Sequence, residues 1–479
     1  MATERACLMV WDGLRPDQVS AEDTPNLWQL AQQGVWFERS YAVYPTLTRA
    51  NSPAISTGCR PGRAGVPGNT FLLPSDGELV RYSTGDAASL PRLSEADGRP
   101  ILLVDTLADR VHRAGGSTVV VGSGSPGSAW LQHPTALEAG DPVIADGLPA
   151  LAGFMDAVRA RFGPLPSKHA LPATDWTAYF TRIITEFVLP EVTPTLLVFW
   201  HTDPDHTSHF RGYGARQTRR ALRDADEHLG AILEAYDRLG LRRTTTTIVT
   251  SDHGGSTITR RARPARDLST LLAHGAAAEN GGSVFVYSSD PAVVDVIRRL
   301  DYVGPVFTRD GRDQTFPLSL VGLDGPRAPD VVFSFAWSDQ TVDGLAGTTV
   351  GTPSKLVVDH GSISPYDLRN TLAASGPEFR AGWRDPAPVG NIDICPTLMQ
   401  LLRLDNGTQV DGRVLSEALL DGTDADEAPS WASKQEARAF TARGREWLQR
   451  VWFEQVGATA YLAGGTVEPA PKASLAANS

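Results

Sequence analysis

Cysteines, basic tracts and long apolar runs are all scarce in this chain. Only Cys7, Cys59 and Cys395 occur in 479 residues, and no two of them form a C-x-x-C pair. The sequence therefore predicts neither a disulfide framework nor a zinc finger. The absence of any apolar run of about eighteen residues argues against a membrane-spanning helix. The net charge of −11, without a basic stretch, argues against a nucleic-acid duplex as the general partner.

The first residues also lack the features of a signal peptide. They pass quickly into the apolar segment Cys7–Trp11, which ends at Asp12, without a basic region or a small-residue cleavage site. We therefore expect a strand here and a soluble, cytoplasmic protein. The length and an ordinary composition, 41% hydrophobic and 21% charged, predict a globular chain with one large body and a smaller added part.

Short β-rich segments alternate with helical ones along most of the chain. This pattern predicts an α/β fold with a mostly parallel central sheet sandwiched by helices. Strands are expected at Cys7–Trp11, Ser117–Gly122, Thr195–Trp200, Thr245–Thr250, Ser283–Tyr287, Val331–Phe335 and Lys355–Val358. Helices are expected after Thr24, which can cap the first one, and at Arg216–Leu239, Pro291–Leu300, Asp393–Leu404 and Trp431–Trp452.

Three parts are expected in the chain. Residues 1–257 and 352–420 would form the metal-binding catalytic core, and residues 258–351 an inserted α/β subdomain that completes the site. Residues 421–479 would form a helical tail, and its aromatic residues favour packing on the body, with a homodimer contact as the alternative. These aromatic residues are Trp431, Phe440, Trp447, Trp452 and Phe453.

Acids and imidazoles follow several of the expected strands. In an open parallel sheet such groups meet just beyond the carboxyl ends of the strands. Clustered carboxylates repel one another unless a cation lies among them, and mixed carboxylate and imidazole ligands suit zinc or a similar divalent ion. The side chains are Asp12, Asp205, His209, Asp252, His253 and His360. Together with one hydroxyl, they would fill two metal sites.

The order of these motifs resembles the alkaline phosphatase superfamily and, within it, the type I phosphodiesterase/nucleotide pyrophosphatase branch. The resemblance runs from Cys7 to about Leu404 and includes PTLTRANS, PGN, PDHTSH, SDHG and HG. It implies two divalent ions, zinc or manganese. One would be held by Asp205, His209 and His360, and the other by Asp12, Asp252, His253 and Thr48.

The same resemblance implies a function. Thr48 would attack phosphorus to form a covalent phosphothreonine, while the Asn69 amide and the Thr48 backbone N–H stabilise the developing charge. The expected enzyme is a hydrolase of phosphodiester or pyrophosphate bonds acting on a small-molecule phosphate ester or nucleotide-like substrate. A phosphonate hydrolase resembling phosphonoacetate hydrolase, a phosphomonoesterase and a catalytically dead binding protein are the alternatives. Arg49 replaces the aromatic residue usual after the nucleophile, and could contact a substrate charge or solvent.

Two further motifs resemble those of other protein classes, but the residues around them argue against the corresponding functions. Cys59 opens C-R-P-G-R, which resembles the sulfatase motif whose cysteine becomes formylglycine, but Thr48 occupies the equivalent place before Thr57-Gly58. Threonine cannot form formylglycine, so a sulfatase is not expected. The G-x-G-x-x-G match at Gly122–Gly127 contains Pro126, which removes an N–H, and a turn rather than a nucleotide site is expected there.

Overall fold

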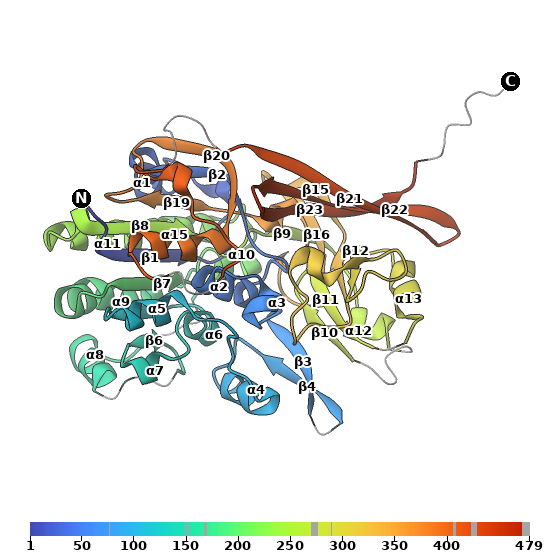
Figure 1. Ribbon diagram of the computed structural model, residues 1–479, viewed down its shortest axis with the longest axis horizontal. Helices are drawn as coiled ribbons and strands as arrows, with labels where there is room; N and C mark the ends of the chain where they lie inside the picture. Colours follow the sequence, from blue (N-terminus) through green and yellow to red (C-terminus); the bar gives the residue numbers. More distant parts are fainter. Residues whose placement is uncertain are drawn as a thin grey trace.

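The main body of the protein is a nine-stranded sheet between two layers of helices (Figure 1). The computed structural model describes residues 1–75, 77–148, 151, 153–166, 170–269, 276–288, 290–405, 409–422 and 429–471. Most neighbouring strands of this sheet are parallel, and the short β18 and β19 run antiparallel to their neighbours. The order is β18 (Arg369–Asn370), β2 (Val35–Tyr41), β19 (Leu372–Ser375), β8 (Thr245–Thr250), β1 (Arg5–Trp11), β7 (Leu196–His201), β5 (Thr118–Gly122) and β6 (Val143–Ala145), with β20 (Trp383–Gly390) also paired to β2. The α/β fold predicted from the sequence is confirmed.

The side chains of β1 point alternately to the two faces of the sheet, and this explains why helices cover both faces. Leu8 and Val10 pack into one core with Ile55 of α2, and Met9 and Trp11 pack into another on the opposite face. Successive strand residues point to opposite faces, so a strand that is apolar throughout requires cover on both. One layer contains α2 (Thr48–Thr57), α5 (Leu107–Arg113) and α15 (Ile394–Leu401), and the other α1 (Pro25–Gln33), α9 (Thr174–Ile183) and α11 (Arg216–Arg238).

The first helix begins where the sequence predicted but is capped differently. The Thr24 side chain accepts no hydrogen bond from the first turn of α1. Instead, the Asp226 carboxylate of α11 accepts the backbone N–H groups of Asn26 and Leu27 at 2.9 and 2.8 Å. A carboxylate at a helix N-terminus also interacts favourably with the helix dipole. The cap therefore comes from a distant helix, and it ties α1 to α11.

Residues 258–351 contain a five-stranded sheet separate from the main one. Its order is β10 (Ala276–Asn280), β11 (Ser283–Tyr287), β14 (Val331–Phe335), β12 (Val303–Thr308) and β13 (Phe316–Pro317), and α13 (Val293–Arg299) packs on it. A four-stranded sheet joins this region to the body through β15 (Trp337–Val342), β16 (Leu345–Gly351), β9 (Ser256–Arg261) and β17 (Val358–Asp359). The strand predicted at Lys355–Val358 is wrong over most of its length, because only Val358 of that segment pairs with β9.

The C-terminal segment is a sheet, so the predicted helical tail is wrong. Strands β21 (Trp431–Ala442), β22 (Arg445–Val456) and β23 (Thr459–Pro469) form an antiparallel sheet beside the body (Figure 1). Trp447, Gln449, Val451 and Phe453 are buried at every second position of β22, the period of a strand. Packing on the body is the arrangement observed, since Val451 and Phe453 join a core cluster with residues of the body, and the homodimer contact stays a prediction.

The remaining elements are short. They include the hairpin β3 (Thr70–Ser75) and β4 (Glu78–Ser83), and the helices α3 (Pro61–Ala64), α4 (Ser89–Asp97), α6 (Pro126–Trp130), α7 (Ala136–Ala139), α8 (Phe154–Phe162), α10 (Asp205–Arg211), α12 (Pro264–Asp267) and α14 (Pro365–Leu368). Within the described residues, no helix has both the length and the apolar character needed to cross a membrane.

Candidate active site

The side chains expected to bind metal gather at one end of the central sheet. Asp12 follows β1, Asp205 begins α10 after β7, and Asp252 follows β8. Because β7, β1 and β8 are adjacent and parallel, their carboxyl ends deliver these acids to one place. The backbone links them further, since the Asp205 N–H donates to the Asp12 carbonyl at 3.0 Å.

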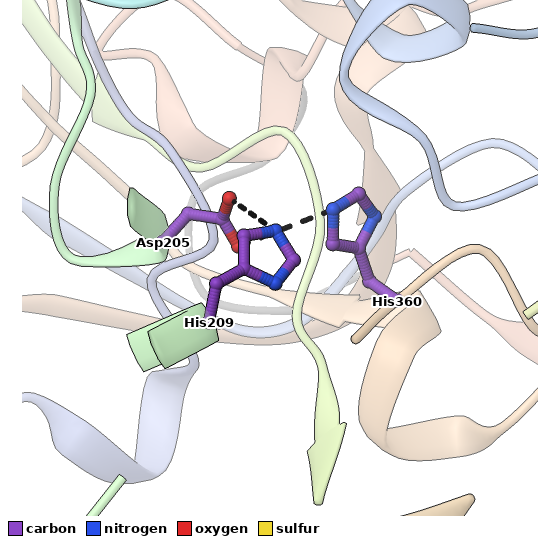
Figure 2. A group of neighbouring side chains, drawn as sticks. All are labelled: Asp205, His209 and His360. Carbon is purple, nitrogen blue, oxygen red and sulfur yellow. Dashed lines mark ion pairs between the residues drawn. The ribbon is translucent and has the colours of Figure 1, made fainter. Parts of the chain in front are cut away.

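One group consists of Asp205, His209 and His360. Figure 2 shows the three side chains pointing toward one another, with His360 coming from a separate segment. Nε2 of His209 lies 2.9 Å from the Asp205 carboxylate, and Nε2 of His360 lies 4.0 Å from it. One potential ligand atom from each residue lies within 4.8 Å of the others, so a single ion can be reached by all three.

A second group consists of Asp12, Asp252 and His253, and all three residues are buried. Nε2 of His253 lies 3.5 Å from the Asp12 carboxylate, 3.1 Å from that of Asp252 and 3.3 Å from Oγ1 of Thr48. Oδ1 of Asp12 and Oδ2 of Asp252 are buried without a hydrogen-bond donor. Buried charged oxygens are costly when unpaired, so these two atoms fit a bound cation.

All three imidazoles are oriented by the backbone. Each ring directs Nδ1 to a carbonyl oxygen, which fixes the proton on Nδ1 and leaves Nε2 as the free acceptor. The pairs are His209 with Val358 at 2.7 Å, His360 with Thr46 at 2.7 Å and His253 with Gly254 at 2.8 Å. A carbonyl behind a histidine ligand sets both its tautomer and its angle, so this arrangement suits metal binding through Nε2.

The charged side chains of the two groups strongly shift one another's pKa values. Burial, together with the neighbouring charges of Asp252 and Asp205, raises the pKa of Asp12 well above its usual range. Burial lowers the pKa of His253, but the Asp252 and Asp12 carboxylates outweigh it and raise the value to about 10. Burial and the charge of His253 hold the pKa of His360 well below its usual range. Three carboxyl groups and three imidazoles thus compete for protons where metal ions would neutralise the acids.

Thr48 lies at the first position of α2. Its side chain is buried beside the second group, and the N–H groups of a first helical turn have no partners within the helix. Asn69 lies next to it, and its Oδ1 accepts the backbone N–H of Arg49 at 3.0 Å. The Asn69 amide NH₂ is therefore the group available to an anion bound at the nucleophile.

A cavity of about 470 Å³ opens in front of these residues. The seven side chains expected to bind metal all lie at it or directly behind it, together with Asn69. Cys59 does not line it, since it is buried beyond the far end of α2. The lining residues that the sequence analysis did not single out include Ser125, Thr202, Glu279, Thr352 and Ser354.

Ser125, which the sequence analysis did not place in the site, lies in a recognisable sequence motif. It lies in the G-x-G-x-x-G segment, which forms a turn and leads into α6, with Ser125 as the N-cap. Close packing requires glycine at position 127 of this motif, because a Cβ there would lie 1.7 Å from the Thr84 carbonyl oxygen. The motif therefore serves close packing of the turn, and it brings Ser125 into the cavity wall.

Comparison with known proteins agrees with this geometry. The family model for type I phosphodiesterase / nucleotide pyrophosphatase matches residues 6–361. The chain is 22% identical to bis(5'-adenosyl)-triphosphatase enpp4 of Mus musculus over 84% of this chain and 79% of that protein. It is 23% identical to ectonucleotide pyrophosphatase/phosphodiesterase family member 7 of Mus musculus over 53% of this chain and 51% of that protein.

Solved structures show a similar fold. Murine ectonucleotide pyrophosphatase / phosphodiesterase 5 superimposes with a TM-score of 0.61 at 17% identity, covering 85% of this chain and 97% of that one. An inactive form of the same murine protein in complex with AMP superimposes with a TM-score of 0.59 at 18% identity, with the same coverage. The central sheet and its helical layers therefore share the fold of these solved structures.

Proposed function

This chain belongs to the type I phosphodiesterase / nucleotide pyrophosphatase family, and from this premise we propose that Thr48 is the nucleophile of a metal-dependent phosphodiesterase. Family membership makes the chain a phosphoric ester hydrolase acting on phosphodiester or pyrophosphate bonds. The alternative of a binding protein without catalysis is therefore set aside. The proposed substrate is a small-molecule phosphate ester of nucleotide-like chemistry. The observation that carries the proposal is the position of the Thr48 hydroxyl, 3.3 Å from Nε2 of His253.

The two residue groups fit two divalent ions. Asp205, His209 and His360 would hold one, and Asp12, Asp252, His253 and Thr48 the other, with zinc the proposed metal and manganese the alternative. When bound, such ions lower the pKa of a coordinated hydroxyl and neutralise charge on attacking and leaving oxygens. The support comes from donor chemistry: three carboxylates, three imidazoles with Nε2 free, and two buried oxygens without donors.

The reaction would proceed in two steps, through a phosphothreonine at Thr48. Oγ1 of Thr48 gives its proton to solvent water and attacks phosphorus, forming a Thr48 O–P bond while the P–O bond to the leaving group breaks. The leaving oxygen takes up a proton from water. Attack by water on the phosphothreonine forms a new P–O bond, breaks the bond to Thr48 and returns the proton to its hydroxyl.

Asn69 and the start of α2 stabilise the charge that develops. The Asn69 amide and the Thr48 backbone N–H can donate to one non-bridging oxygen, because both lie at the same wall of the cavity. Donors already fixed in place stabilise a transition state more than mobile water does. The hydrogen bond from the Arg49 N–H to Oδ1 of Asn69 keeps the amide in that orientation.

The test is hydrolysis of bis(p-nitrophenyl) phosphate by protein of defined zinc or manganese content. We expect turnover that stops on chelation and returns with metal, and loss of turnover of about a thousandfold or more in Thr48→Ala. Thr57→Ala, at the other end of α2 and outside the cavity, is the matched control. Mass spectrometry of acid-quenched wild-type protein should find phosphate on Thr48. Undiminished turnover in Thr48→Ala would refute the mechanism.

The remaining expectations need separate measurements. A phosphonate such as phosphonoacetate, included in the same substrate panel, separates a phosphonate hydrolase from a phosphodiesterase. The cytoplasmic location and the homodimer stay predictions, testable by fractionation of cells and by the mass of the protein in solution.

A further inference from the structure

Arg49 places an unpaired positive charge in the wall of the cavity. The described part of the chain provides its guanidinium with no hydrogen bond and no ion pair, and Nε is buried without an acceptor. Asp12, Asp252 and Asp205 attract the guanidinium electrostatically without pairing with it. The residue as a whole is partly exposed, but its buried Nε–H is costly to leave without an acceptor. This cost is offset when a ligand in the cavity supplies anionic oxygens.

The surroundings of Arg49 restrict where its guanidinium can go. It packs against the backbone of Gly85, where an added Cβ would lie 3.2 Å from both Cζ and Nη2. Gly85 thus permits the close approach, and its backbone closes one side of the guanidinium. Arg49 follows Thr48 in α2, and its own N–H holds Asn69. The guanidinium therefore belongs to the wall that faces the phosphoryl oxygens.

The rest of the cavity is polar and offers little to an aromatic base. Among the residues that the structure describes, no phenylalanine, tyrosine or tryptophan lines it. Stacking on such rings is a principal means of holding a nucleobase. Recognition here must instead come from charge and hydrogen bonds, and Arg49 is the arginine that lines this cavity.

We propose that Arg49 is a specificity-determining residue that binds a phosphoryl group carrying two negative charges, so that the site also hydrolyses phosphate monoesters. A diester has one negative charge on the transferred phosphorus, whereas a monoester dianion has two. An arginine can donate two parallel hydrogen bonds to such a group. The inference rests on the proposed function, because it assumes attack by Thr48 in the same cavity.

Two esters with the same leaving group provide the test. p-Nitrophenyl phosphate and bis(p-nitrophenyl) phosphate differ in the charge on the transferred phosphorus. We expect Arg49→Gln to lower the ratio of monoester to diester kcat/KM by about a hundredfold, and Arg49→Lys to lower it less, because lysine retains the charge without the planar fork. Arg92→Gln is the matched control, since Arg92 is exposed on α4 and does not line the cavity.

A binding measurement keeps the inference testable without turnover. Calorimetric titration of inorganic phosphate into the metal-loaded protein should show affinity reduced at least tenfold in Arg49→Gln and unchanged in Arg92→Gln. An unchanged ester ratio, or equal phosphate affinity in wild type and Arg49→Gln, would overturn the role of Arg49. Absence of turnover of both esters by the wild type would refute the proposed function instead, and the phosphate titration would still decide the role of Arg49.

Discussion

The imidazoles of His253 and His360 stack on one another, with ring centroids 3.6 Å apart and planes inclined by 16°. His253 belongs to the buried group and His360 to the other, so the two candidate metal sites share a wall of two rings. Two positive imidazolium rings at this separation would repel each other, and, after burial, the charge of His253 is one reason that the pKa of His360 lies well below its usual range. The stack therefore places the two candidate metal sites next to each other, and ions bound there would be available to one phosphoryl group.

Each of the two residue groups should bind its own metal ion, independently of the other. We predict that the wild type binds two zinc ions per chain and that Asp205→Ala binds one, because each group has its own acid and imidazole ligands. Elemental analysis after dialysis and titration with zinc would measure the number of ions. Added zinc should also raise the unfolding temperature. The free energy of unfolding should increase by about 3 kcal/mol when the free zinc concentration exceeds the dissociation constant a hundredfold.

A surface carboxylate provides the control for this experiment. Asp156→Ala, on α8 and outside both groups, should still bind two ions. A single ion in the wild type, or two ions in Asp205→Ala, would show that the groups do not act as separate sites.

Asn69 is predicted to act on the transition state rather than on substrate binding. Asn69→Ala removes the amide donor and should lower kcat for the diester by about a hundredfold or more, with a much smaller change in KM. Initial rates over a range of substrate concentration separate the two constants. Unfolding at the wild-type temperature would show that the loss is local. An effect confined to KM would contradict the assignment.

The site could be predicted from sequence because its residues follow strands that are easy to recognise. β1, β7 and β8 are β-rich segments that are buried along almost their whole length, and in parallel sheets the groups beyond such strands converge whatever their distance along the chain. The lining residues were harder to find. Glu279 reaches the cavity from the region of residues 258–351, and Ser354 from the segment that follows it. The placement of both depends on packing between sheets that no local pattern records.

The tail shows how an available signal can be misread. Its aromatic residues suggested a helical face, yet alternate burial along β22 has a period of two. Arg443 and Gly444 both have positive φ, at 53° and 71°, and form the turn between β21 and β22. Two consecutive residues with positive φ are typical of a two-residue hairpin, for which glycine is a strong sequence signal. Weighting that turn above the aromatic spacing would have predicted the hairpin.

The cap of α1 could not have been predicted from its own sequence. Thr24 is a suitable capping residue, but Asp226, two hundred positions away, accepts the N–H groups instead. We predict that Asp226→Ala lowers the free energy of unfolding by about 1–3 kcal/mol, since it leaves two N–H groups of α1 without this acceptor. Denaturant titration measures the change. Asp237→Ala, elsewhere on α11, is the control, and equal losses in the two variants would contradict a capping role.

Asp385 should make stability depend on pH. Burial in β20 and the charge of Glu417 raise its pKa to about 7, Oδ1 accepts only the Ala387 N–H, and Oδ2 has no donor. In the unfolded chain its pKa is about 4. Between about pH 4 and pH 7 the folded state therefore holds a proton that the unfolded state releases, and stability contributed by this group falls as the pH rises.

Replacing this carboxyl by an amide isolates its contribution. Asp385→Asn cannot ionise, so its free energy of unfolding should match that of the wild type near pH 4 and exceed it by about 2 kcal/mol or more at pH 8. Denaturant titrations at both pH values measure the difference. Asp421→Asn, which changes an exposed aspartate, should show no such divergence. A difference that stays constant with pH would mean that the Asp385 carboxyl ionises as readily in the folded protein as in the unfolded chain, despite its burial.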